Sequence, residues 1–303
     1  MENFGRKPRF EARRTRKKAH AEIPNRFPAR PDKDSGLKRL CPGNYSVNQG
    51  FFRHNIIGRN KSRSRPFSFV ACFATLLRAH FMFIPLKDLN PSRTYPFVNI
   101  TLILANIAAF LYEVNLEATL PRGAFDALLL AYSTVPARFP AFLAGRVAFD
   151  VSFAPLVTSM FLHSGFLHIA GNMLFLWIFG DNVEDFFGHF TYFFFYMVCG
   201  IGAGLLHVLF NFHSNIPAIG ASGAISGVMG AYILLYPRAR ILTLVFIFPL
   251  PVPAVIFLGL WYVLQFLAGI SSIGAKVTGG VAVWAHIGGF LLGMLLTSLA
   301  KRR

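Results

Sequence analysis

Apolar residues occur in six long runs that fill the last two thirds of the chain, separated by short polar or proline-rich stretches. A run of about 20 apolar residues is long enough to cross the hydrocarbon core of a bilayer as a helix. The pattern predicts an all-α, polytopic membrane protein with a bundle of six transmembrane helices. The predicted spans are 97–114, 166–183, 189–210, 221–236, 252–270 and 283–299.

The stretches between the runs differ in character. Residues 115–159 contain four prolines, too many for one transmembrane helix, yet the stretch is too apolar for a flexible linker. We expect it to fold partly into the membrane surface. Residues 180–188 are expected to form a short polar turn between the second and third spans, and residues 274–280 a glycine-rich link before the sixth.

Composition and charge support this interpretation and orient the bundle. Hydrophobic residues make up 54% of the chain and charged residues only 14%, too few for a water-soluble surface. Residues 1–93 hold 21 of the 30 lysines and arginines and 6 of the 13 acids, so their net charge is +15. The positive-inside rule places this end, Arg238, Arg240 and the C-terminal Lys301 in the cytoplasm, which agrees with six crossings. We therefore expect both termini to be cytoplasmic.

The N-terminal residues 1–81 are rich in arginine and lysine and lack sustained periodicity. We expect a disordered basic arm there and a membrane domain at 82–303. A contact with anionic lipid or nucleic acid is a second interpretation, although no specific nucleic acid is expected. An organelle transit peptide is a third, but such peptides avoid acids and this arm has five. A fourth is that translation starts at Met82, shortly before the first span.

The cysteines and histidines indicate no metal. Cys41, Cys72 and Cys199 form no C-x-x-C pair, so no disulfide framework or zinc site is predicted. A metal site formed by His163, His207 and His213 is an alternative, but their spacings match no zinc-ligand motif. We expect neither a metal nor another cofactor.

Polar side chains inside a span are costly, so each one calls for a reason. His168 and Asn172 lie four residues apart in the second span. This spacing places them on one helix face, where both can donate hydrogen bonds toward the same point. For an isolated pair, a contact between helices is the ordinary explanation.

Ser222 stands at the start of the fourth span, in the run GASGAISGVMG at 220–230. Free backbone N–H groups at a helix N-terminus can stabilise a developing negative charge. Gly220 and Gly223 allow backbone or substrate to approach closely. The alternative is helix packing, because Gly223 and Gly227 have the spacing of a helix-contact motif. Alone, the run is weak support for a nucleophile.

His286 opens the sixth span, and Gly289 and Gly293 follow on the same helix. Small residues on the fourth and sixth spans allow these helices to pack closely, which would bring the Ser222 hydroxyl within reach of the His286 imidazole. A serine becomes a good nucleophile when a neighbouring base takes its proton, and histidine titrates near neutral pH. With the polar pair of the second span, this predicts a site for acyl transfer.

Three segments together carry a family resemblance: HSGFLHIAGN at 163–172, GASGAISG at 220–227 and AHIGGF at 285–290. In this combination the chain resembles the rhomboid family of intramembrane serine proteases, in its bacterial type, from about residue 82 to residue 299. The bacterial style of this core suggests a bacterial plasma (inner) membrane, with an organelle membrane as the alternative. The resemblance implies a six-helix membrane bundle that cleaves membrane-anchored substrates. It also implies that transmembrane proteins and the lipid bilayer are the partners of this chain, and it leaves the oligomeric state open.

The resemblance further implies a role for each site residue. Ser222 takes the place of the nucleophile and His286 that of the general base, in a Ser–His dyad. His168 and Asn172 take the oxyanion-stabilising places, together with the Ser222 backbone N–H. Other matched positions are Gly220 and Gly223 around the serine, His163 near a water cavity, Glu184 as a structural acid, and Trp261 and Gln265 on the fifth span, which the family is thought to use as a lateral gate.

One residue departs from the family pattern. Some members place an aromatic residue four positions after the serine, where it packs on the catalytic histidine, whereas this chain has Ser226. The departure leaves open how the His286 ring is held.

Two other classes of protein compete with a protease. A transporter or channel would also place polar groups in its spans, usually as charged relays or repeated halves. The last four predicted spans contain no acid, and the chain has no internal repeat. A binding relative without activity would lack the serine or the histidine, and this sequence has both.

Overall fold

The computed structural model describes residues 83–272 and 282–302. The basic arm at 1–81, the proposed start at Met82 and the glycine-rich link at 274–280 lie outside the described residues. The division of the chain at residue 82 therefore stays a prediction.

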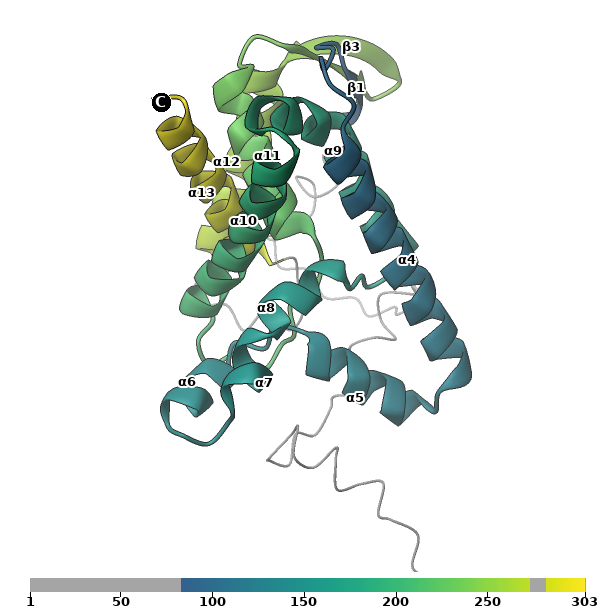
Figure 1. Cartoon of the computed structure of the whole chain (residues 1–303), viewed down its shortest axis with the longest axis vertical. Helices are drawn as coiled ribbons and strands as arrows, with labels where there is room; N and C mark the ends of the chain where they lie inside the picture. Colours follow the sequence, from purple (N-terminus) through teal and green to yellow (C-terminus); the bar gives the residue numbers. More distant parts are fainter. Residues whose placement is uncertain (1–82, 273–281, 303) are drawn as a thin grey trace, which may run out of the picture.

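Six apolar helices form a bundle in the described part of the chain (Figure 1). They are α4 (Phe97–Thr119), α9 (Phe166–Phe187), α10 (His189–Phe210), α11 (Ser222–Leu235), α12 (Ala254–Ser272) and α13 (Val283–Ala300). Each coincides with a predicted span, with ends that differ by at most five residues. The predicted all-α, polytopic membrane fold is confirmed.

The described helices differ in how far they reach across a membrane. By length and composition, α4, α10, α12 and α13 are each able to cross alone. The helix α9 meets the same criterion together with Phe149–Phe161, from which it is bent by 80°. The helix α11 has only 14 residues and extends about 21 Å, less than the ~30 Å of a hydrocarbon core. One end of α11 therefore lies at membrane depth, inside the bundle.

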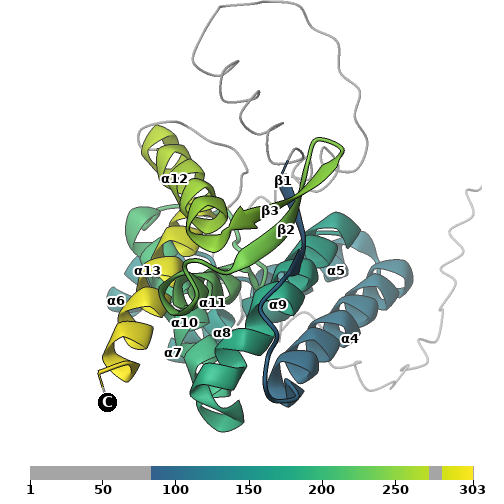
Figure 2. The same ribbon diagram turned by 90° about the horizontal axis from the view of Figure 1, so that it is seen from above.

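The short helix α11 is the centre of the bundle. Residues 223–232 are all buried, and α9, α10 and α13 surround them (Figure 2). Its contact with α13 is made by backbone, because a Cβ on Gly289 or Gly293 would lie 2.0 Å from a carbonyl oxygen of α11. Only glycine allows this approach, which fixes the N-terminus of α11 against the N-terminal half of α13.

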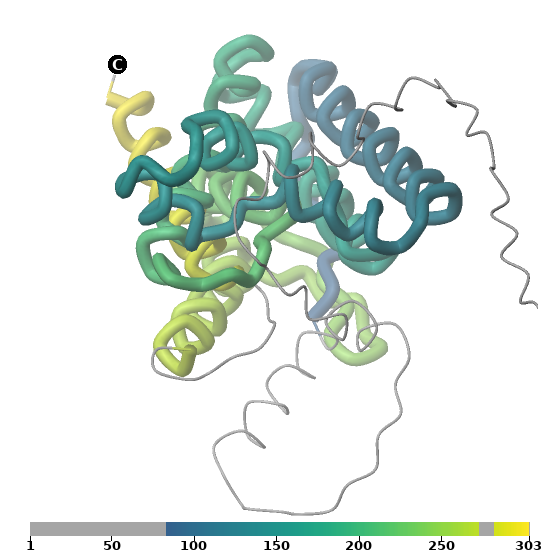
Figure 3. The backbone as a smooth tube through the Cα atoms, turned by 90° about the horizontal axis from the view of Figure 1, so that it is seen from below, coloured from purple at the N-terminus to yellow at the C-terminus, as the bar shows by residue number. Residues whose placement is uncertain are grey.

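The proline-broken stretch after α4 folds into short helices. They are α5 (Arg122–Tyr132), α6 (Arg138–Leu143), α7 (Phe149–Phe153), α8 (Pro155–Thr158) and the 3-10 turn η2 (Ser159–Phe161). Figure 3 shows this stretch lying across one end of the bundle. The buried Arg138 side chain donates hydrogen bonds to the carbonyls of Leu130 and Ser133 and thereby closes the stretch around the end of α5.

The predicted polar turn at 180–188 is wrong. The helix α9 continues to Phe187 and ends only at Gly188, which has a φ of 74°. Two acids of this segment, Glu184 and Asp185, accept hydrogen bonds from backbone N–H groups at and just before the start of α4. Fully buried Glu184 accepts hydrogen bonds from the N–H groups of Val98 at 3.0 Å and Asn99 at 2.7 Å. It thereby satisfies free donors in the first turn of α4.

A small antiparallel sheet at the other end of the bundle was not predicted. It has the order β1-β2-β3, formed by β1 (Phe83–Asp88), β2 (Arg240–Val245) and β3 (Phe248–Pro253). The predicted fifth span begins at 252, but residues 252 and 253 belong to β3, an edge strand that tolerates its prolines. The pairing of β1 with β2 joins segments far apart in sequence, which local patterns do not reveal.

Candidate active site

Ser222 and His286 are in hydrogen-bond contact. The serine Oγ and the histidine Nε2 are 2.8 Å apart. Ser222 is the first residue of α11, and His286 lies in the first turn of α13. The imidazole is buried and the serine is half-buried. The glycine-mediated contact between the two helices places these two side chains side by side.

Two residues of α12 hold the His286 ring from its other side. The Nδ1 of His286 lies 2.9 Å from Oε1 of buried Gln265. An amide oxygen only accepts hydrogen bonds, so Nδ1 carries the ring proton and Nε2 presents its lone pair to Ser222. The Trp261 ring lies 5.8 Å from the imidazole ring, measured between centroids. The sequence interpretation noted both residues but did not pair them with His286; their spacing of four residues on an apolar helix was the available signal.

Ser226, which stands four residues after Ser222 where some family members have an aromatic residue, makes a hydrogen bond within α11. Its Oγ donates a hydrogen bond to the carbonyl oxygen of Ser222, one turn earlier, at 2.6 Å. The Ser226 side chain is buried. An aromatic ring does lie beside the imidazole, but it is that of Trp261 on α12.

His168 and Asn172 border the residues that precede Ser222. Gly220 has a φ of 121°, and a Cβ on it would lie 2.8 Å from His168 Nε2 and 3.7 Å from Asn172 Nδ2. The Ser164 N–H donates to His168 Nδ1 at 3.3 Å, so the proton of a neutral His168 ring lies on Nε2 and faces Gly220. Asn172 Nδ2 is buried and has no hydrogen-bond partner among the described residues. Two donors therefore converge on this point.

His163 and an acid that the sequence interpretation left without a role lie next to this pair. The His163 ring is buried, lies 5.1 Å from the His168 ring, and has no hydrogen-bond partner within residues 83–272 and 282–302. Its backbone N–H donates to Oε2 of Glu113, a buried residue of α4, at 3.1 Å. An acid within the first predicted span was the signal for this contact, which holds the segment before α9.

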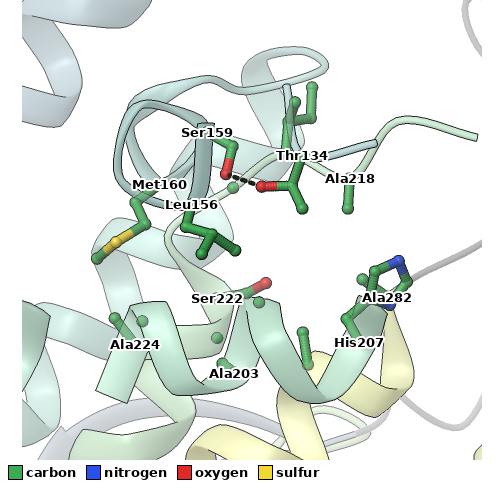
Figure 4. A pocket seen from close by; sticks show the side chains of 16 residues that line it. Thr134, Leu156, Ser159, Met160, Ala203, His207, Ala218, Ser222, Ala224 and Ala282 are labelled. Carbon is green, nitrogen blue, oxygen red and sulfur yellow. Dashed lines mark hydrogen bonds between the residues drawn. The ribbon is translucent and has the colours of Figure 1, made fainter. Parts of the chain in front are cut away.

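A small cavity of about 40 Å³ lies beside Ser222 (Figure 4). Small residues make up much of its wall, among them Ala203, Ala218 and Ala282. The hydroxyls of Thr134 and Ser159 are 2.9 Å apart at its rim. A cavity needs about 10–15 Å³ to hold one water, so this space suits a few waters or one small side chain.

Comparison with known proteins gives the family of the chain. Residues 151–303 match the Rhomboid domain. The chain is 33% identical over 150 residues to Rhomboid protein 1, mitochondrial, of Saccharomyces cerevisiae, which covers 46% of this chain and 40% of the yeast protein. RHOMBOID-like protein 1 of Arabidopsis thaliana is 34% identical over 150 residues, covering 46% of this chain and 33% of the plant protein. Rhomboid protease AarA of Providencia stuartii is 27% identical over 214 residues, covering 66% and 71%.

The relatives also bear on the question of which membrane contains this protein. The chain spans less than half the length of the yeast and plant proteins that it matches. A multi-pass membrane protein is confirmed, but the relatives include mitochondrial and plant proteins, so the bacterial plasma membrane stays a prediction. Because the Rhomboid domain matches half of the residues of this chain, the chain belongs to the rhomboid family of intramembrane proteases.

Proposed function

We propose that this protein is an intramembrane serine endopeptidase that cleaves membrane-anchored proteins in or near their transmembrane segment. The observation that carries the proposal is the 2.8 Å contact between Ser222 Oγ and His286 Nε2 at the N-terminus of α11. A hydroxyl beside a correctly protonated imidazole is the arrangement that an activated serine requires. Because α11 is too short to cross the hydrocarbon core, we propose that its N-terminus and this pair lie at membrane depth, where a transmembrane substrate would lie.

The proposed reaction has two stages. His286 Nε2 takes the hydroxyl proton as Ser222 Oγ attacks the carbonyl carbon of the scissile peptide bond. His286 then gives this proton to the leaving amine, and an ester between Ser222 and the substrate is left. Water hydrolyses that ester, with His286 again acting as the base. Gln265 keeps the Nδ1 proton in place throughout, as a neutral counterpart of the acid in a catalytic triad.

Hydrogen-bond donors near Gly220 are proposed to stabilise the oxyanion. His168 Nε2–H and the Asn172 amide lie at this glycine, and the first N–H groups of α11 have no acceptor within the helix. Preorganised donors of this kind stabilise the developing charge without reorganisation, which is frequently the largest catalytic term. The amide nitrogen of Asn172, which has no hydrogen-bond partner among the described residues, supports this role. A buried donor without a partner lowers the stability of the fold, so a function in binding the oxyanion would explain why it is there.

The cavity beside Ser222 is proposed to receive a substrate side chain next to the scissile bond. Its volume of about 40 Å³ and its alanine-lined wall favour a small side chain. We expect a substrate with alanine next to the scissile bond to be cleaved, and the same substrate with phenylalanine at this position to be cleaved much more slowly. The cleavage rates of these two versions of one substrate measure the preference. Equal rates would remove the cavity from the binding site.

The test is cleavage of a single-span protein by the purified full chain, both reconstituted in liposomes. Wild type is expected to cut the substrate, and Ser222→Ala and His286→Ala are expected not to cut. Ser298→Ala is the matched control, because Ser298 is a half-buried serine on α13 whose hydroxyl donates to the Leu295 carbonyl oxygen of the same helix. A folded wild type that binds the substrate without cutting it would replace the proposal with a binding function.

A further inference from the structure

The hairpin of β2 and β3 ends in an exposed apolar tip. Val245 and Phe248 pair across a loop of two residues, Phe246 and Ile247. The exposed fractions of Phe246, Ile247 and Phe248 are 60%, 78% and 63%. Phe246 has a φ of 55°, which L-residues with bulky side chains rarely adopt and which glycine adopts freely. A large apolar side chain thus occupies a strained position where glycine would be the natural residue.

The hairpin is joined directly to a helix long and apolar enough to cross a membrane. β3 runs directly into α12 at Ala254, so the base of the hairpin lies at the end of a membrane span. Val255 and Ile256 at that end of α12 are exposed and apolar, as expected of lipid-facing residues. Figures 1 and 2 show the hairpin across the helix ends, with its loop projecting outward beyond them.

Charges near the base of the hairpin suit an anionic lipid surface. Arg238 and Arg240 are exposed just before and at the start of β2, and Lys87 is exposed on β1. Lys301 and Arg302 lie exposed after α13, at the same end of the bundle. Basic residues close to a span bind the headgroups of anionic lipids. Apolar side chains beside basic ones are typical of segments that lie in a membrane interface.

The free edge of β3 does not suit another protein strand. Phe248, Leu250 and Val252 direct their N–H groups toward β2, as the Ala254 N–H does toward Ala239 O at 2.8 Å. The alternate positions, which face the free edge, are Pro249, Pro251 and Pro253. Proline has no N–H to donate, so this edge cannot form a normal ladder with an added strand.

We propose that the hairpin tip Phe246–Phe248 inserts into the headgroup and acyl-chain boundary of the bilayer at the basic end of the bundle. The bound partner is anionic lipid of the same membrane that the spans cross. Insertion offsets both the exposure of the three apolar side chains and the strain at Phe246. The tip would thereby anchor the connection between α11 and α12 to the membrane, independently of any cleavage reaction.

The experiment measures the depth of a nitroxide label in liposomes that contain phosphatidylglycerol. The full chain carries Ile247→Cys, with Cys41 and Cys72 replaced by serine and the buried Cys199 retained. The matched control is Arg93→Cys, an exposed position at the same end of the bundle. We expect the label at 247 to be relaxed more by oxygen than by a water-soluble nickel complex, and the label at 93 to show the reverse. Equal nickel access at both positions would overturn the proposal.

Two further arms separate lipid insertion from other causes. Contact between copies of the chain would shield the label at 247 only at high protein-to-lipid ratios, and that result would also overturn the proposal. In the second arm, Phe246→Gly is added to the Ile247→Cys chain. The loop then keeps its backbone without strain, but one inserted ring is lost, so we expect greater nickel access at 247 with unchanged folding. Unchanged access would contradict a role for Phe246 in the insertion.

Discussion

At the scale of single residues, His286 is positioned by side chains from two other helices. Ser222 contacts Nε2 and Gln265 contacts Nδ1, while the Trp261 ring lies against the imidazole. The presence of a serine and a histidine in glycine-rich spans was enough to predict the first contact. The contact with Gln265 was not predictable, because a single sequence does not give the rotation of α12 relative to α13.

Gln265→Leu is expected to lower kcat by about fivefold, because one neutral hydrogen bond contributes about 1 kcal/mol. KM should be unchanged, since the lost bond orients the proposed base, His286, and does not bind substrate. Gln265→Glu keeps an acceptor at Nδ1 and should restore the rate. Steady-state kinetics measure kcat and KM of both variants. Equal losses in both, with a matching loss of thermal stability, would show that Gln265 is merely structural.

Asn172→Ala removes one of the donors that converge on Gly220. We expect a loss of about 100–1000-fold in rate, as for other single oxyanion donors. The fold should persist, because the amide nitrogen has no partner among the described residues that its removal would leave unsatisfied. Cleavage rate and thermal unfolding of purified protein measure the two effects. An unchanged rate in a folded variant would remove Asn172 from the site.

At the scale of elements, the backbone contact between α11 and α13 sets the distance between Ser222 and His286. A Cβ on Gly289 would lie 2.0 Å from the Gly223 carbonyl oxygen, so Gly289→Ala must push the helices apart. We expect near-complete loss of cleavage and a loss of stability of about 1–3 kcal/mol. Gly259→Ala in α12 is the matched control, because a Cβ there meets nothing within 4 Å. Similar activity of the two variants would contradict this account.

A second junction of elements predicts pH dependence. Asp88 of β1 accepts hydrogen bonds from Asn182 of α9 and Tyr232 of α11. Burial raises the pKa of Asp88 from 3.8 to about 6; the nearby charge of Asp181 also raises the pKa, whereas the Tyr232 hydrogen bond and Lys87 lower it. The folded protein thus holds a proton that the unfolded chain releases near pH 4. Its stabilising effect is complete below pH 4 and is lost as pH rises through about 6.

Asp88→Asn keeps an acceptor for both hydrogen bonds and cannot ionise. The variant should therefore be more stable than wild type at neutral pH, and this difference should shrink as pH falls from about 6 toward 4. Thermal unfolding in detergent between pH 4 and 8, compared between the two proteins, measures it. A difference in Tm that does not depend on pH would show that Asp88 ionises as freely in the folded state as in the unfolded chain.

At the scale of the whole molecule, hydropathy predicted where the helices lie, but it did not predict how they contact one another. The spans were found because lipid demands long apolar runs. The extension of α9 to Phe187 was missed because its acids, such as Glu184, serve the distant N-terminus of α4. The sheet was not predicted because β1 pairs with β2, a strand that is far away in the sequence. In both cases the missed feature depends on a contact between segments far apart in the sequence, and local sequence patterns do not predict such contacts.

The central claim is that Ser222 is a nucleophile activated by His286 at the end of a short, buried helix. The most direct measurement is reaction of the folded full chain with a fluorophosphonate, a serine-reactive probe, with the modified residue located by mass spectrometry. We predict that Ser222 is modified in wild type and that modification is lost in Ser222→Ala and His286→Ala. Modification of another serine, or equal reaction of wild type and His286→Ala, would contradict the account.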